Sequence, residues 1–184
     1  TTGLEIGNQS IIEIGACKVD EDGKEYIFQE FIKPTQEISS KITSITGITN
    51  EMVKHAPPLK NVLELFTEFC ADATVVAHNA QFDVPWLLSC YKRLNIPTKS
   101  SQVVCTLEWA KKRSEPRRSL GVLSKKYQIG HENAHRALAD AMVTKSLFFI
   151  YKNDSTDDPP QQSIDRFNEI ANQVISQYPN FSQP

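Results

Sequence analysis

The 184-residue chain has no apolar run long enough to cross a membrane and no closely spaced pair of cysteines. Its longest apolar stretch, at 147–151, is far shorter than the roughly 20 residues of a transmembrane helix. The first residues are polar and contain a glycine, unlike a signal peptide. The four cysteines are far apart, which disfavours a zinc site or a disulfide framework. We therefore expect a protein of a reducing, cytoplasmic compartment.

The chain also lacks a strong charge of either sign, since its formal net charge is −2. A protein that binds nucleic acid through its overall field would be strongly basic. A local exception is the segment 111–126, where the only acidic residue among many lysines and arginines is Glu115. This segment could follow a phosphate backbone, but a solvated helix face is an equally good interpretation.

The spacing of apolar residues predicts an α/β domain. Runs of β-branched residues predict strands at 11–19, 26–32, 74–78 and 103–105. The first two strands are joined by a turn in which Gly23 can take a positive φ. Helical spacing predicts helices at 59–70, 81–94, 106–113, 119–127 and 137–151. A hairpin followed by alternating strands and helices indicates a sheet of mixed direction.

A change in composition at Lys152 divides the chain. Residues 152–163 are rich in Asn, Asp, Ser, Pro and Gln, which is typical of a linker. The tail 164–184 begins with an amphipathic helix. We therefore assign 1–151 to one domain and expect the helix either to fold back on it or to dock on a partner, such as a polymerase or a second copy.

Asp83 follows a buried strand directly and lies in the first turn of the next helix. Its carboxylate is expected at the carboxyl end of that strand, where ligands bind in open α/β sheets. The alternative is that Asp83 only stabilises the amino end of its helix.

Asp140 lies in an otherwise apolar helical segment. Burying its charge without a partner is costly, so a metal ion or an arginine would have to compensate it. His135 stands five residues earlier, and an imidazole titrates near neutral pH, as a general base requires. The rival is His131, whose surroundings, Gly130 to Asn133, read as a surface loop. We favour His135.

Three segments together carry a family resemblance: Thr1-Thr2-Gly3-Leu4, His78-Asn79-Ala80-Gln81-Phe82-Asp83 and the His-x4-Asp pattern from His135 to Asp140. In this order they resemble the DnaQ-like 3′–5′ exonucleases of the DEDDh type, which include the proofreading subunits of DNA polymerase III and RNase T. The resemblance covers residues 1–151. It implies a ribonuclease H-like fold, a mixed five-stranded sheet flanked by helices.

The resemblance also implies a mechanism. Asp83 and Asp140 would bind two divalent metal ions, Mg²⁺ or Mn²⁺, and His135 would be the general base. The substrate would be contacted by Thr2, Gly3, Leu4, Gly47, Ile48, His78, Asn79 and Phe82. On the residues alone, Phe82 is equally well a core side chain.

In that family an Asp-x-Glu pair directly precedes Thr-Thr-Gly and completes the metal site. Two further acidic ligands are therefore expected upstream of Thr1, because Glu5 and Glu13 do not stand in the required place. The pair would lie on a central strand between the strands at 11–19 and 74–78. Without that strand these two would be separated by about 9–10 Å, twice the usual spacing.

The resemblance predicts hydrolysis at the 3′ end of single-stranded DNA, in proofreading or repair during replication. An RNase T-like exoribonuclease acting on RNA is an alternative within the same chemistry. A non-catalytic nucleic-acid-binding homologue is the third possibility, should the upstream acids be absent. The tail could join a polymerase catalytic subunit or form a homodimer.

Overall fold

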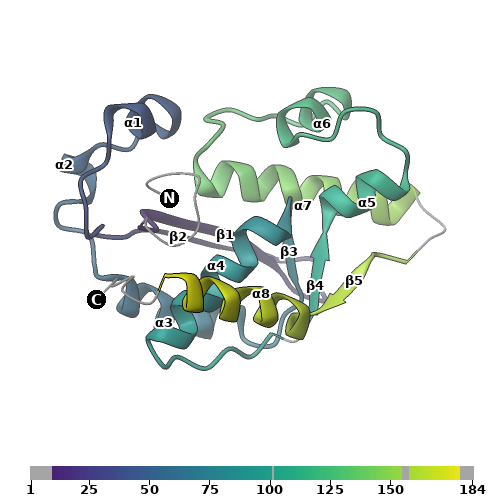
Figure 1. Ribbon diagram of the computed structural model, residues 1–184. Coiled ribbons are helices and arrows are strands. Elements are labelled where there is room, and N and C mark those ends of the chain that lie inside the picture. The colour runs from purple at the N-terminus through teal and green to yellow at the C-terminus, as the bar shows by residue number, and fades with distance from the viewer. Residues whose placement is uncertain (1–9, 101, 155–157, 179–184) are drawn as a thin grey trace.

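The computed structural model describes residues 10–100, 102–154 and 158–178. The first half contains β1 (Glu13–Val19), β2 (Glu25–Phe31), α1 (Ser40–Thr46), α2 (Asn50–Val53), α3 (Leu59–Cys70), β3 (Val75–Ala77) and α4 (Ala80–Arg93). The second half contains β4 (Gln102–Cys105), α5 (Thr106–Lys112), α6 (Leu120–Lys126), α7 (Ala137–Asp154), β5 (Gln161–Ser163) and α8 (Ile164–Gln177). Figure 1 shows how these elements are arranged.

Strands β1 and β2 form the predicted antiparallel hairpin, with Glu13 opposite Phe31 and Val19 opposite Glu25. In the turn, the Asp20 carboxylate accepts the backbone N–H groups of Asp22 and Lys24 at 3.1 and 2.8 Å. Gly23 has a φ of 80°, so the expected positive φ is confirmed.

The other strands form a separate sheet in the order β3-β4-β5, in which β3 and β4 are parallel and β5 is antiparallel to β4. The expectation of one five-stranded sheet is therefore wrong for the described residues, which hold five strands in two sheets. Strand β5 was not foreseen, and nothing in the described part of the chain pairs β1 with β3.

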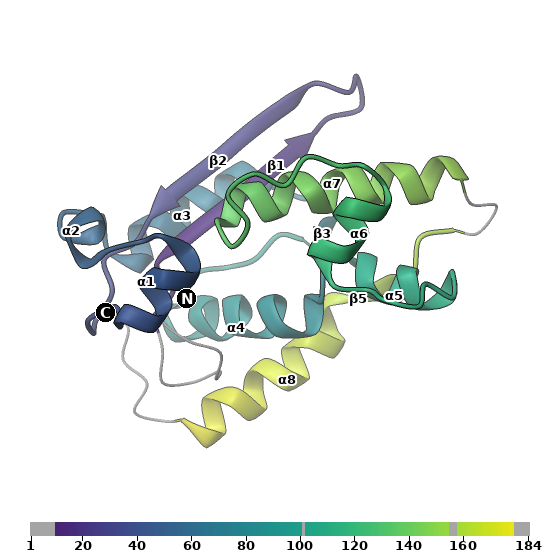
Figure 2. The same cartoon turned by 90° about the horizontal axis from the view of Figure 1, so that it is seen from above.

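Helix α7 connects the two sheets, because it packs against β1 and also contacts β3 (Figure 2). The approach to β1 is unusually close at Gly15. A Cβ atom added there would lie 2.2 Å from the backbone nitrogen of Leu138 and 2.5 Å from the carbonyl carbon of Ala137. Only glycine leaves room for the start of α7 at this distance.

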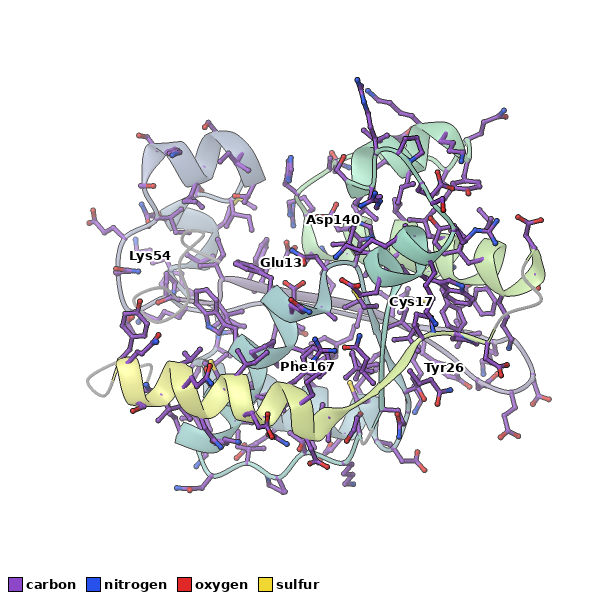
Figure 3. All side chains as sticks on the ribbon, turned by 45° about the vertical axis from the view of Figure 1, so that its right-hand side comes forward. Glu13, Cys17, Tyr26, Lys54, Asp140 and Phe167 are labelled. Carbon is purple, nitrogen blue, oxygen red and sulfur yellow. The ribbon has the colours of Figure 1, made fainter. Side chains whose placement is uncertain are left out.

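The segment after residue 151 belongs to the same core. The linker expected at 152–163 is too long, since α7 continues to Asp154 and residues 161–163 form β5. Helix α8 folds back on α4. Phe167 and Ala171 are fully buried in a cluster with Val84 and Leu88 of α4, and Figure 3 shows Phe167 directed into the molecule. The apolar stripe of the tail is therefore used within the chain.

Most remaining elements agree with the sequence to within a few residues, and α3 matches its predicted range of 59–70. Helix α1 was not predicted; Ser39 caps its first turn and Gly47, with a φ of 72°, ends it. Among the described residues, no helix is both long and apolar enough to span a membrane.

Candidate active site

The end of β3 and the start of α4 form one side of the candidate site. Asn79, at a φ of 65°, turns the chain sharply from the strand into the helix. The first backbone N–H of α4, that of Ala80, points toward the sulfur of Cys105 at 3.4 Å, at the end of the neighbouring strand β4. The carboxyl ends of two parallel strands therefore meet here, as expected for a ligand site in an α/β sheet.

His78 is fully engaged by the protein at this junction. Its Nε2 lies 2.8 Å from the carbonyl oxygen of Arg118, and its Nδ1 lies 2.9 Å from the hydroxyl of Thr106. Burial lowers the pKa of His78, which favours a neutral ring that donates from Nε2 and accepts at Nδ1. A substrate contact through a ring nitrogen of His78 would require breaking one of these bonds.

Thr106 is the first residue of α5, whose N-cap position is Cys105 and has no side-chain cap. The Thr106 hydroxyl meets His78, as above. Neither Thr106 nor Arg118 was picked out as a site residue from the sequence. A polar residue directly after a buried strand, as with Thr106, was the available signal.

Asp83 lies in the first turn of α4, as predicted. Its side chain reaches solvent, although protein surrounds it on most sides. This desolvation, together with the negative charge of Asp140, raises the pKa of Asp83 to about 6. The Asp140 charge also acts on His78. These three residues therefore share one electrostatic environment.

Asp140 lies in the first turn of α7 and accepts two hydrogen bonds from the segment before it. One of its oxygens, Oδ1, is 2.6 Å from Nε2 of His131 and 3.3 Å from the backbone nitrogen of His135. The side chain of Asp140 is 36% exposed and that of His131 12% exposed. His131 is therefore not the surface-loop residue that the sequence indicated, because its ring contacts a candidate metal ligand.

His135 differs from His131 in its exposure and in its contact with Asp140. It has a φ of 70°, a left-handed conformation that is uncommon for a residue with a side chain, and it is exposed. It reaches Asp140 only through its backbone N–H. Within the described part of the chain, the His135 ring makes no hydrogen bond, so both ring nitrogens are open to solvent.

Glu13 anchors the start of α7. Its carboxylate accepts hydrogen bonds from Arg136, from the backbone N–H of Ala137 and from the Gln29 amide. Burial alone would raise the pKa of Glu13, but these bonds and the positive charge of Arg136 outweigh it and lower the pKa. Figure 3 labels Glu13 and Asp140, which both lie toward the centre of the molecule.

Of the residues expected to contact substrate, some are exposed and others pack in the core. Gly47 is exposed, and a Cβ added there would meet nothing within 4 Å, so its positive φ explains the glycine better than a close contact. Ile48 is only 1% exposed and packs in the core with Ile42 and Val53. Phe82 packs beside the core residue Trp86, at 6.2 Å between ring centroids.

Asn79 is exposed at the turn into α4. Thr2, Gly3 and Leu4 lie outside the described residues. The exposed apolar side chain nearest Gly47 in sequence is that of Ile45, at 41% exposure.

The basic segment 111–126 is partly neutralised. Lys111 pairs with Glu108, Arg113 with Asp154 and Lys126 with the buried Glu115. Lys112, Arg117 and Lys125 are exposed, and among the residues described none of them has an acidic partner within 4.0 Å. Three of the seven basic side chains are thus in ion pairs, three are exposed without one, and Arg118 donates to the backbone carbonyl of Glu115.

The carboxylates of Asp83 and Asp140 are suitable ligands for a divalent cation, but they are only two. Oxygen ligands are those that Mg²⁺ and Mn²⁺ prefer. Asp83 and Asp140 repel each other electrostatically, and a cation between them would relieve that repulsion. Over 10–100, 102–154 and 158–178, no three His, Cys, Asp or Glu side chains gather closely enough to hold a metal ion.

A model of the RNase T family, described as exonuclease, matches residues 1–148. The chain belongs to this exonuclease family. Similar curated proteins include the PolC-type DNA polymerase III of Streptococcus suis (strain 98HAH33), 36% identical over 179 residues that make up 96% of this chain and 12% of the polymerase. That of Streptococcus sanguinis (strain SK36) is 40% identical over 156 residues, 84% of this chain and 11% of the polymerase. The exonuclease chain thus spans about a tenth of these relatives.

Solved structures agree on the fold. Exonuclease X in complex with 5′ overhanging duplex DNA has a TM-score of 0.67 and 25% identity, with 93% of this exonuclease and 95% of that chain covered. Exonuclease I has a TM-score of 0.68 at 18% identity, and the match covers 96% of this chain and 41% of the exonuclease I chain. The nuclease domain of 3′hExo, a DEDDh family member bound to rAMP, has a TM-score of 0.60 at 14% identity. The match covers 83% of this chain and 98% of that domain. The fold is therefore ribonuclease H-like, as the sequence predicted.

Proposed function

We propose that this exonuclease domain hydrolyses the terminal phosphodiester at the 3′ end of single-stranded DNA, in proofreading or repair during replication. The observation that carries the proposal is the arrangement at the start of α7 and α4. Asp83 and Asp140 act on each other electrostatically, and His135, which is exposed, donates its backbone N–H to the Asp140 carboxylate. The curated relatives are replicative polymerases, which favours DNA over RNA.

Asp83 and Asp140 would hold two divalent metal ions together with the Asp-x-Glu pair expected before Thr1. The ions would neutralise the phosphate and activate a water molecule. In this arrangement Asp83, which accepts no hydrogen bond from any other described residue, would gain a cationic partner. A metal ion at Asp140 would either compete with the His131 ring for Oδ1, where the contact is 2.6 Å, or bind the other carboxylate oxygen.

His135 is the general base in this proposal. An exposed imidazole with both nitrogens open can take a proton from an attacking water molecule. His131, whose Nε2 is bound to Asp140, would orient that carboxylate. The opposite assignment follows from the same geometry, since a carboxylate-bound histidine is also a common form of general base. Comparing the two single variants decides between them.

The test uses the chain preceded by a strand that carries Asp-x-Glu, with an Ala-x-Ala version as the matched control. Each is incubated with Mg²⁺ or Mn²⁺ and with single-stranded DNA labelled at its 5′ end. The proposal predicts a ladder of products shortened from the 3′ end by the Asp-x-Glu protein only. If both proteins bind the strand and neither cleaves it, the non-catalytic binding function replaces the exonuclease.

RNA is the second candidate substrate, because one structural neighbour was solved with rAMP bound. An RNA strand of the same sequence, in the same assay, separates the two. Cleavage of RNA at a higher kcat/KM than DNA would assign the domain to RNA maturation. Association with a polymerase catalytic subunit, proposed from the PolC relatives, is tested separately by co-purification of the two proteins.

A further inference from the structure

The carboxylate of Glu13 is almost completely enclosed, with 4% of its side chain exposed. Its oxygens accept from Arg136 Nη2 at 2.7 Å and Nε at 3.2 Å, from the backbone nitrogen of Ala137 at 2.9 Å and from Gln29 Nε2 at 3.0 Å. One buried carboxylate thus ties strand β1 to strand β2 and to the first residue of α7. An enclosed carboxylate with this many donors is held in one geometry.

Two further contacts fix the same junction. The guanidinium of Arg136 lies over the ring of Phe31, 5.3 Å from its centroid, which adds a cation–π contact to β2. At Gly15, two residues after Glu13, the backbone of α7 approaches so closely that no side chain would fit. Helix α7 is therefore set against β1 by a bidentate ion pair on one side and by direct backbone packing on the other.

The junction reaches the candidate site through the backbone. The N–H of Asp140 donates to the carbonyl of Arg136 at 3.0 Å, and the N–H of His135 points to the Asp140 carboxylate at 3.3 Å. Asp140 therefore lies in the first turn of α7, which Glu13 holds at Ala137, and His135, in the loop just before α7, is tied to that turn through its backbone N–H. Any shift or rotation of this turn moves both side chains together.

We propose that Glu13 is a positioning residue of this site: by holding Arg136 and the amide of Ala137, it sets where His135 and Asp140 stand. Glu13 does not touch substrate or metal in this role. Its effect on catalysis rests on the proposed exonuclease function, but the positioning itself does not. A displacement of about 1 Å in a reacting group can cost on the order of 10²-fold in rate, so the effect is measurable.

The chain offers a matched control in Glu115. It is a second carboxylate with 4% of its side chain exposed, paired with Lys126 at 2.6 Å. Its partners lie on α6 and at Tyr127, not on the first turn of α7. Glu13→Gln and Glu115→Gln each remove one buried charge, so a purely structural role predicts the same consequences for both.

Hydrogen exchange gives a readout that does not depend on activity. In the Asp-x-Glu-preceded protein, Glu13→Gln should speed amide exchange at residues 135–140, because Ala137 loses its charged acceptor. It should also weaken the Mg²⁺-induced rise in melting temperature and lower kcat by up to about 10²-fold with little change in KM. Glu115→Gln should leave exchange at 135–140 and kcat unchanged.

Arg136→Lys serves as the second variant, since lysine cannot form the two-pronged contact and yet keeps the charge. It should reproduce the exchange pattern of Glu13→Gln, should the latter fail to fold. Equal exchange and equal kcat in the Glu13, Arg136 and Glu115 variants would overturn the proposal. Faster exchange at 135–140 in Glu13→Gln, combined with a parent protein that shows no nuclease activity, would instead count against the proposed function and leave the positioning role standing.

Discussion

The two candidate carboxylates of this exonuclease are treated differently by their surroundings. Asp140 accepts the His131 ring at 2.6 Å and the His135 backbone N–H at 3.3 Å. Asp83 accepts no hydrogen bond from any other residue in the described segments, and desolvation raises its pKa to about 6. Among the described residues, Asp140 thus receives two hydrogen bonds from other residues, whereas Asp83 receives none apart from the one from its own backbone N–H.

This difference indicates which carboxylate depends more on a cation. A buried or crowded charge without donors is unstable unless a positive group approaches it. Asp83 is then the residue at which a divalent ion gains most by binding, whereas Asp140 is held in place before any ion arrives. The predictions below test this contrast, from the largest expected effect to the smallest.

Replacing either carboxylate should abolish hydrolysis without unfolding the protein. Asp83→Asn and Asp140→Asn each remove an oxygen ligand and a negative charge, and both should reduce cleavage of a 5′-labelled strand to the level seen without metal. Asp22→Asn, in the exposed hairpin turn, is the control and should cleave normally. Wild-type turnover in either site variant would show that the ligands are wrongly assigned.

Variants of the two histidines should differ in kcat. His135→Gln should lower it by ~10²–10⁴-fold, the range for loss of a general base, and His131→Gln should cost less because it acts through Asp140. The rate of the parent should also fall in acid, because a protonated imidazole cannot accept a proton. If His131→Gln is the more damaging change, the roles of the two rings should be exchanged.

Metal binding should stabilise the folded state unequally in the two aspartate variants. A ligand present at 100 times its Kd raises the free energy of unfolding by about 2.7 kcal/mol. In the protein with its Asp-x-Glu pair, Mg²⁺ should raise the melting temperature, and Asp83→Asn should remove more of that rise than Asp140→Asn. A larger loss in Asp140→Asn would reverse the contrast between the two carboxylates.

Without metal, Asp83 should make stability depend on pH in an unusual direction. Its pKa is raised on folding, so the folded state binds its proton more tightly than the unfolded state does, and stability rises as pH falls through about 6. Asp83→Asn should therefore melt higher than the parent at pH 8, with the advantage shrinking toward pH 4. Because Asp83 reaches solvent, the difference is small. An advantage independent of pH would contradict the prediction.

Acid should also expose the opposite behaviour of Glu13. Its pKa is lowered on folding, so its contribution is present above pH 4.5 and is lost as pH falls further. The interval between pH 5 and pH 7 therefore isolates Asp83 from Glu13 in such melting curves.

The sequence predicted the elements whose signal is local. The helix at 59–70 and the hairpin turn at Gly23 depend on spacing and turn chemistry, and both were found. Strand β5 was missed because Gln161, Gln162 and Ser163 have the composition of a linker and become a strand only by pairing with β4. Its strand character lies in the tertiary contact and not in its own residues.

In the candidate site, too, the sequence predicted only what has a local signal. Asp83 and Asp140 each carry a local signal, a carboxylate after a buried strand and one in an apolar helix, and they do act on each other electrostatically. The contact of His131 with Asp140 and that of His78 with Thr106 join residues through the fold. No spacing in the sequence encodes those pairs, so His131 was set aside as a loop residue.

Strand β5 has a consequence for the behaviour of the protein in solution. It covers the outer edge of β4, while Phe167 and Ala171 of α8 cover apolar residues of the same sheet. An uncovered strand edge beside an apolar face is a template for pairing between molecules. We therefore expect β5 and α8, which follow a segment with the composition of a tether, to protect the domain from aggregation, and we expect a version cut after α7 to assemble into insoluble material.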